Sequence, residues 1–331
     1  MAEPEKKFLE RLESAWLHDL DFVDLYVSLY KDLPSYYQIA EPGKFNVMPK
    51  NLASEYHADI VELRRELETV LQNADEASVV FDGIRLRASK ARTTRGETWV
   101  ALRRVADKPP MLDKLGFTMP SVQALRELGD RDGLILICGG TGQGKTTTAN
   151  ALLYDYLNRL GGVAFTIEDP VEYLLDGCHG ASGLCYQVEI KEEHEWALYL
   201  KRALRWHPRY IMVGELRTPE AVNQLLRAAN SGHLVITTMH AGSIEEGLDG
   251  LLQLSRQAIG DMGPTLLASG LAAVMHQSFL HHSVATRLYV TENGNLGDPA
   301  RSLIRERHVG QITTFVDQQE ARRAMAANAG R

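Results

Sequence analysis

A glycine-rich segment, Gly139–Thr146 (GGTGQGKT), has the residue types and the spacing of a phosphate-binding loop. Its glycines let the backbone curl so that successive N–H groups point at phosphate oxygens. Lys145 supplies a flexible point charge to the β- and γ-phosphates, and the Thr146 hydroxyl is placed to ligate Mg²⁺. The predicted phosphate-binding residues are Gly139, Gly140, Thr141, Gly142, Gln143, Gly144, Lys145, Thr146 and Thr147.

The sequence on both sides of this loop supports the same interpretation. An apolar run, Gly133–Cys138, precedes it and is typical of a strand buried on both faces of a parallel sheet. A helical pattern over Lys145–Leu160 follows, and its first turn adds the positive end of a helix dipole. A chance glycine-rich turn would lack both neighbours. Because no Asn-Lys-x-Asp guanine-reading motif occurs, we expect ATP rather than GTP, together with Mg²⁺.

A second apolar run, Val163–Ile167, ends in two carboxylates, Glu168 and Asp169. In an open α/β sheet, ligands bind beyond the carboxyl ends of the strands. Side chains there can hold a metal ion or orient water, and we expect Glu168 to do so. The alternative is a solvated acidic loop.

A third run, Tyr210–Val213, is followed by Gly214, Glu215, Leu216 and Arg217. Phosphate-loop enzymes carry an acidic residue near the metal and the attacking water at this position. A carboxylate that reaches past a glycine suits the polarisation of water, so Glu215 is the predicted catalytic carboxylate. The alternative is an ion pair between Glu215 and Arg217 that only caps the strand.

Two histidines bracket a fourth apolar run, Leu234–Thr238. His240 stands at its carboxyl end, where a γ-phosphate would be sensed. His233 stands at the other end and is a candidate nucleotide residue or a brace for a helix or an interface. A histidine metal site is not expected, because no third ligand has a suitable spacing.

The elements around these runs predict two domains. From Gly133 onward, strands alternate with helical patterns, which indicates a doubly wound α/β domain. The expected helices are Lys145–Leu160, Glu193–Arg205, Pro219–Ser231 and Ser243–Leu254. The first 80 residues show helical spacing over Phe8–Leu20 and Ala53–Leu71, with strands and turns over Leu25–Phe45.

Residues 81–104 read as a basic hairpin before a linker. Ile84, Leu86 and Ala88 alternate with polar residues, as in a strand with one apolar face, and Thr98–Arg103 forms the second strand. The stretch holds seven basic and two acidic residues, a local net charge of +5. The run Lys108–Pro110 marks the domain boundary.

Composition limits the class of protein. The 331 residues include 36 basic and 43 acidic ones, for a net charge of −7, which disfavours a protein that coats DNA. Three cysteines without a Cys-x-x-Cys pair disfavour a disulfide scaffold and a four-cysteine zinc module. The charged start resembles no signal peptide, and no apolar run approaches 18 residues, so a cytoplasmic protein is expected.

Four segments together resemble the Walker A, Asp box, Walker B and His box motifs of the secretion and type IV pilus ATPase superfamily. In chain order they read GGTGQGKTTT, TIEDPVEY, LRWHPRYIMVGELR and GHLVITTMHA. Ala300–Ile312 resembles the C-terminal motif of the pilus retraction ATPases. Ala77–Ser89 and Leu102–Val105 resemble their arginine-bearing hairpin. Two departures, Thr218 after the Walker B arginine and His207-Pro208-Arg209 before that strand, affect subunit contacts rather than hydrolysis.

The resemblance implies a hexameric motor that works on a type IV pilus, or on a type IV secretion or conjugation system, two possibilities that it does not separate. It implies a RecA-like P-loop ATPase domain with a smaller N-terminal α+β domain similar to a PAS fold. The expected divisions are residues 1–107 for the N-terminal domain, 108–115 for a linker, 116–262 for the ATPase domain and 263–331 for a C-terminal helical region. Partners would be further copies of the chain and inner-membrane platform or secretion-system proteins, which would bring it to the cytoplasmic face of the inner membrane. No direct nucleic-acid binding is expected.

The resemblance also assigns roles to residues. Lys145 and Thr146 bind phosphate and Mg²⁺, Glu168 positions metal or water, Glu215 is catalytic and His240 senses the nucleotide. The resemblance further implies arginines that reach the phosphates from a neighbouring subunit, and the candidates are Arg85, Arg87 and Arg103. Their alternative is a solvated hairpin face.

Three alternatives remain at this stage. A nucleic-acid motor of RecA or helicase type shares the ATPase core but needs a basic channel. A nucleotide-bound scaffold would not hydrolyse ATP, and it has no need of Glu168 and Glu215.

In the C-terminal segment, Arg301 and Arg305 lie four residues apart on one helical face and are expected to meet a partner. The alternative is that the helix merely packs against the ATPase core.

Overall fold

The computed structural model describes residues 16–329, apart from residues 31–32, 40–46, 281–282, 293 and 295–296. The chain divides into two compact units, Met1–Ala106 and Asp107–Arg331. Most of the helix predicted over Phe8–Leu20 lies outside the described residues, and Leu17–Asp19 is a short 3-10 helix. Within the part of the chain that the structure describes, no helix has both the length and the apolar character needed to cross a bilayer.

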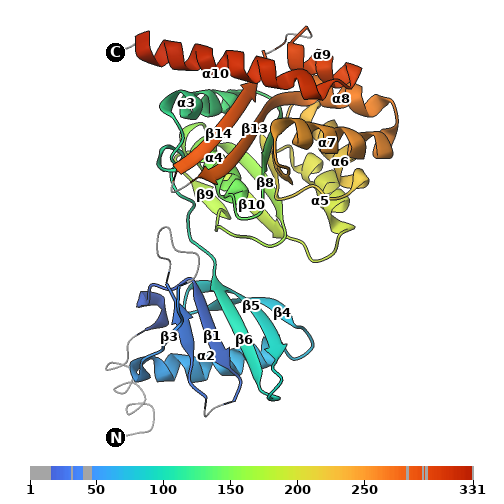
Figure 1. Ribbon diagram of the computed structural model, residues 1–331. Coiled ribbons are helices and arrows are strands. Elements are labelled where there is room, and N and C mark those ends of the chain that lie inside the picture. Colours follow the sequence, from blue (N-terminus) through green and yellow to red (C-terminus); the bar gives the residue numbers. More distant parts are fainter. Residues whose placement is uncertain are drawn as a thin grey trace, which may run out of the picture. The chain divides into compact units, whose positions relative to one another are not determined.

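The first unit is α+β. Its six strands form an antiparallel sheet in the order β3-β2-β1-β6-β5-β4 (Figure 1). The strands are β1 Asp24–Ser28, β2 Tyr36–Gln38, β3 Lys50–Asn51, β4 Glu76–Phe81, β5 Ile84–Arg92 and β6 Thr98–Arg104. Helix α2, His57–Val70, packs Leu63 and Leu67 against the buried face, where Leu86 and Leu102 also lie. The predicted hairpin is present as β5 and β6, and its likeness to a PAS fold stays a prediction.

Three arginines of the hairpin, Arg85, Arg87 and Arg103, lie on the other face of this sheet. Arg85 and Arg87 alternate with the buried residues of β5, and Arg87 pairs in register with Arg103 of β6. Arg103 already has a partner, because its Nε and Nη2 atoms donate to the two carboxylate oxygens of Asp24 at 2.8 and 3.1 Å. Asp24 of β1 therefore offsets part of the positive charge of the hairpin. The sequence pattern did not predict that β1 pairs with β6.

The second unit holds an eight-stranded mixed sheet in the order β14-β13-β7-β12-β11-β8-β10-β9. The strands are β7 Gly133–Gly139, β8 Gly162–Glu168, β9 Gly177–His179, β10 Gly183–Glu189, β11 Tyr210–Val213, β12 Leu234–His240, β13 Leu271–Leu280 and β14 Ser283–Val290. The helices are α3 Met119–Glu127, α4 Lys145–Arg159, α5 Glu195–Ala203, α6 Pro219–Ala229, α7 Ile244–Ile259, α8 Met262–Gly270, α9 Pro299–Glu306 and α10 Ile312–Ala329. The predicted α/β class is confirmed, because helices alternate with the parallel strands β7, β8, β11 and β12.

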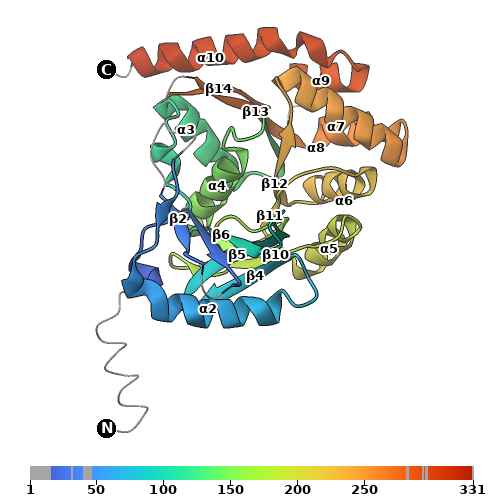
Figure 2. The same ribbon diagram turned by 60° about the horizontal axis from the view of Figure 1, so that its bottom comes forward.

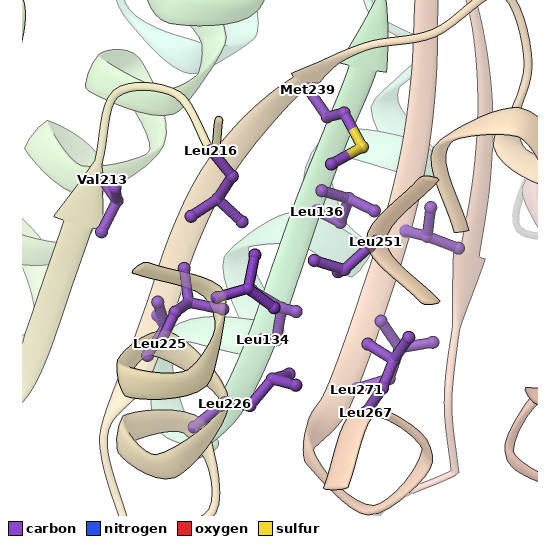
Figure 3. Close-up of a cluster of buried hydrophobic side chains, with 14 of the residues drawn as sticks. Leu134, Leu136, Val213, Leu216, Leu225, Leu226, Met239, Leu251, Leu267 and Leu271 are labelled. Carbon is purple, nitrogen blue, oxygen red and sulfur yellow. The ribbon is translucent and has the colours of Figure 1, made fainter. Parts of the chain in front are cut away.

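Helices cover both faces of this sheet, which explains why β7 is apolar throughout. Leu134 and Leu136 of β7 point into a cluster with Leu225, Leu226 and residues of α7 and α8 (Figure 3). The intervening Ile135 and Ile137 pack on the other face against α3 and α4. Figure 2 shows α6, α7 and α8 on one side of the sheet and α3 and α4 on the other. Packing on both faces therefore fixes the position of β7, the strand that leads into the glycine-rich loop.

The prediction that residues 263–331 are helical is wrong in part, because β13 and β14 lie there. β13 runs parallel to β7, and β14 pairs antiparallel with β13 at the edge of the sheet. The edge is covered by α10, which lies along β14 (Figure 1). Gln319 bonds both the N–H and the C=O of Val290, and Glu320 accepts from the N–H of Leu288. Side chains of α10 therefore satisfy edge groups that would otherwise be free to pair with another strand.

Arg301 of α9 is buried rather than offered to a partner. Its Nη1 atom donates to the carbonyl oxygens of Ala268, at 2.9 Å, and Ser269. These carbonyls belong to the last turn of α8, where backbone acceptors lack helical partners and the dipole favours a cation. Only 8% of Arg301 is exposed. The expectation that Arg301 meets another protein is therefore wrong, and its role is to join α9 to α8.

Candidate active site

The glycine-rich loop joins β7 to α4, as predicted, and its glycines are required by its geometry. Gly142 and Gly144 have φ angles of +72° and +74°, which L-residues with side chains rarely adopt. A Cβ atom on Gly139 would lie 2.6 Å from the carbonyl oxygen of Gln277, so that position has no room for a side chain. Helix α4 then begins directly at Lys145, with the loop at its N-terminus.

A cavity of about 380 Å³ opens above this loop. It is bounded by the loop and by the carboxyl ends of β8, β11 and β12, as expected for an open α/β sheet. Ten predicted site residues line it: Thr141, Gly142, Gly144, Lys145, Thr146, Thr147, Glu168, Asp169, Glu215 and His240. Pro170, Glu172, Gly214 and Thr238 also line it and were not predicted.

Lys145 is buried beneath the cavity, and among the described residues no carboxylate lies within ion-pair distance of its ammonium. Its Nζ atom donates to Gly140 O at 2.9 Å and lies 3.4 Å from His240 Nδ1. Thr141 Oγ1 is 3.4 Å from the same histidine nitrogen. Burial lowers the pKa of the Lys145 ammonium, and the nearby Glu215 carboxylate opposes that shift. A phosphate group entering the cavity would supply the anion that this ammonium lacks at close range.

Glu215 faces the cavity from the end of β11. Its Oε1 atom lies 3.5 Å from His240 Nε2, while its Oε2 atom accepts from Arg217 Nη2 at 3.0 Å and from Arg217 Nε at 3.3 Å. The hydrogen bonds and charge of Glu215 raise the pKa of Arg217. One carboxylate oxygen is therefore held by an arginine, and the other is directed toward the histidine and the cavity.

Glu168 is almost fully buried at the end of β8, with 1% of its surface exposed. Its Oε1 atom accepts from Thr166 Oγ1 at 2.7 Å and from Gln187 Nε2 at 2.9 Å. Its Oε2 atom has no hydrogen-bond partner among the described residues. Burial raises the pKa of Glu168 to about 7, although both hydrogen bonds oppose the rise.

Glu168 and Thr146 fit the needs of a Mg²⁺ ion that arrives with a nucleotide. Mg²⁺ keeps several waters and takes one or two protein oxygens together with substrate phosphates. Both residues line the cavity, and the second oxygen of Glu168 is buried with no hydrogen bond to any described residue. Within the described ranges, no group of three or more His, Cys, Asp or Glu side chains is arranged to hold a metal ion.

Comparison with known proteins identifies the family of this chain. The family described as type II/IV secretion system protein matches residues 71–324, about three quarters of the chain. The chain belongs to this family. The predicted resemblance is thus confirmed.

Relatives of the secretion system family include the type IV pilus retraction ATPase PilT of Pseudomonas aeruginosa. It is 32% identical over 261 residues, which cover 76% of this chain and 72% of PilT. A twitching motility protein of Neisseria gonorrhoeae is 32% identical over 192 residues, which cover 57% of this chain but only half of that protein. A crystal structure of the pilus retraction motor PilT with bound ADP superimposes with a TM-score of 0.69 at 26% identity, covering 96% of this chain and 90% of that one.

The structure does not bring every predicted residue of this secretion-family chain to the cavity. His233 lies at the amino end of β12, about 20 Å along the strand from His240, and it contacts the carbonyl oxygen of Pro208 at 2.6 Å. Its predicted contact with nucleotide is not supported within this unit. Gln143 turns toward β13, and Arg217 reaches the site only through Glu215. Arg85, Arg87 and Arg103 belong to the other unit, and their role stays a prediction.

Gln187 is a site residue that the sequence did not reveal. Its Nε2 atom donates to Glu168 Oε1 and to Tyr173 O, at 2.9 and 3.0 Å. Its Oε1 atom accepts from the backbone N–H groups of Leu175 and Asp176 at 2.6 and 2.8 Å. One side chain thereby fixes Glu168 and the segment after it. It stands 19 residues beyond Glu168 on β10, outside any recognisable motif.

Replacing Gln187 tests whether it positions Glu168. We expect Gln187→Leu to weaken activity or the apparent Mg²⁺ affinity by about 10- to 100-fold, the usual effect of losing a residue that orients a ligand. Gln187→Glu keeps an acceptor for the two N–H groups but cannot donate to Glu168, so it should be impaired as well. The measurement is the Mg²⁺ dependence of ATP hydrolysis. Normal Mg²⁺ dependence in Gln187→Glu would show that Gln187 serves only to anchor the loop.

Proposed function

We propose that this chain is a Mg²⁺-dependent ATPase and one subunit of a hexameric motor that works on a type IV pilus or a secretion system. The observation that carries the proposal is the buried Lys145 at the glycine-rich loop, with Glu215 and His240 facing the same cavity. A protein that only binds phosphate has no need of a carboxylate and a histidine placed 3.5 Å apart at that point. The names of the pilus and secretion relatives support the same conclusion.

Each residue then has a separate task in hydrolysis. Lys145 and the loop N–H groups hold the β- and γ-phosphates, and Thr146 and Glu168 would hold Mg²⁺, which neutralises charge on the phosphate oxygens. Glu215 Oε1 accepts a proton from the attacking water, because Oε2 is already engaged by Arg217. His240 contacts the γ-phosphate through Nδ1 or Nε2 and links it to Glu215 and Lys145.

Two observations support the proposed hexameric ring: the family to which the chain belongs and the positive charge of the hairpin. The hairpin with Arg85, Arg87 and Arg103 has a local net charge of +5. Among the described residues, Arg103 forms an ion pair with Asp24, and Arg85 and Arg87 form none. Phosphate supplied from a neighbouring subunit would balance the remaining charge. Partner proteins at the inner membrane would then receive the motion that hydrolysis drives.

Mixing experiments test the ring. Subunits carrying Lys145→Ala and wild-type subunits are combined in varied proportion, and ATP hydrolysis is measured alongside molar mass by light scattering. In a ring whose subunits act together, activity should fall more steeply than the fraction of variant. Activity that falls in strict proportion, or full activity in a monomer, contradicts the ring and leaves hydrolysis by a single chain intact.

A further inference from the structure

The last residues of β13 are tied to the phosphate-binding loop. Gln277 Nε2 donates to Gln143 O, and Phe279 N donates to Gln143 Oε1, both at 2.5 Å. A strand more than 130 residues along the chain from the loop thus holds it through two hydrogen bonds to one glutamine. This arrangement brings the side chain of Phe279 to the rim of the loop.

The ring of Phe279 lies against Gly144 and remains half exposed. A Cβ atom on Gly144 would lie 3.2 Å from Phe279 Cε2 and 3.5 Å from Cζ, and 49% of the phenylalanine is exposed. Phenylalanine has no polar group to justify exposure, and hydrophobic rings of this size normally bury most of their surface. Because it lies beside the phosphate-binding loop, this flat apolar surface is placed to contact a flat group of a ligand whose phosphates bind the loop.

The strand order shows which part of a nucleotide would reach this ring. Glu168 and His240 end β8 and β12, and Glu215 lies two residues beyond β11; all three strands are on one side of β7. Phe279 stands on β13, on the other side of β7. The γ-phosphate must point toward Glu215 and His240, because the attacking water is activated there. The α-phosphate and the nucleoside therefore leave the loop in the opposite direction, toward β13.

We propose that Phe279 is the platform on which the base of the nucleotide stacks. The inference rests on the proposed ATPase function and adds the residue that binds the nucleoside end of the substrate. Every nucleobase has a flat π-face, so stacking contributes affinity without choosing between purines. Phe279 therefore binds the base, whereas Lys145 and the loop bind the phosphates.

Comparing two ligands isolates the contact with the base. The affinities of wild type and Phe279→Ala are measured for a non-hydrolysable ATP analogue and for inorganic tripolyphosphate, both with Mg²⁺. We expect the variant to bind the ATP analogue about 5- to 100-fold more weakly, the range for loss of one base–aromatic stack. Binding of tripolyphosphate should be unchanged, because it has no base. Phe279→Tyr should restore affinity for the analogue.

Trp206 offers a matched control, because it is an aromatic residue that is 53% exposed and contacts Phe165 and Tyr186 rather than the phosphate-binding loop. Trp206→Ala should leave both affinities as they are. Equal weakening of both ligands by Phe279→Ala would overturn the inference, because it would show that the ring only supports the loop. Unchanged affinity for the analogue would also overturn it and place the base elsewhere. If wild type binds neither ligand, the proposed ATPase function itself fails.

Discussion

The Lys145→Ala variant is expected to lose ATP hydrolysis completely. The loop N–H groups would remain, but the charge-assisted contact with the β- and γ-phosphates would go, a loss of about 1.5–3 kcal/mol in binding alone. The transition state would also lose the cation nearest to the developing charge. Phosphate release from ATP by the purified chain is the measurement, with Lys201→Ala, an exposed lysine on α5, as the matched control.

The stability of this variant distinguishes loss of chemistry from loss of the fold. Burial lowers the pKa of Lys145 below its value in the unfolded chain, so its charge opposes folding at neutral pH. Removing the ammonium should therefore leave the melting temperature in the absence of nucleotide unchanged or higher. Unchanged turnover in Lys145→Ala would refute the site, whereas a large fall in melting temperature would show that the lysine supports the fold.

Features that depend on neighbouring residues in the sequence were predicted well. The glycine-rich loop could be located because the conformations of Gly142 and Gly144 demand glycine and because strand and helix signals lie next to them. Glu168 and Glu215 could be placed because each lies at the carboxyl end of a buried parallel strand, Glu168 as its last residue and Glu215 two residues beyond it. Apolar strands buried on both faces give a strong signal even in a single sequence.

The elements that were missed depend on tertiary contacts. The run that contains β13 is apolar and alanine-rich, and such a run suits a buried helix as well as a strand. Pairing with β7 decides in favour of the strand, and this pairing brings Gln277 and Phe279 to the loop. Helical spacing likewise placed Arg301 and Arg305 on one face of α9, but it could not say that the carbonyls of α8 would bury Arg301.

Glu215→Gln is expected to slow ATP hydrolysis at least about 100-fold, the usual size of a general-base contribution. ATP binding should persist. Glutamine keeps the volume of the side chain but cannot take a proton from water. The ion pair with Arg217 is also lost, yet 51% of the Arg217 side chain is exposed, so the fold should be little affected. Single-turnover hydrolysis and nucleotide affinity are measured separately.

The Glu220→Gln variant tests whether slower ATP hydrolysis is specific to loss of the carboxylate at position 215. Glu220 is an exposed glutamate in the first turn of α6, five residues further along the same segment, and its loss should alter neither rate nor affinity. If Glu215→Gln weakens nucleotide binding but hydrolyses each bound ATP at the normal rate, Glu215 is a binding residue. The attacking water would then need another base. Among the carboxylates that line the cavity, Glu168 is the next candidate, because its Oε2 atom is buried without a partner among the described residues.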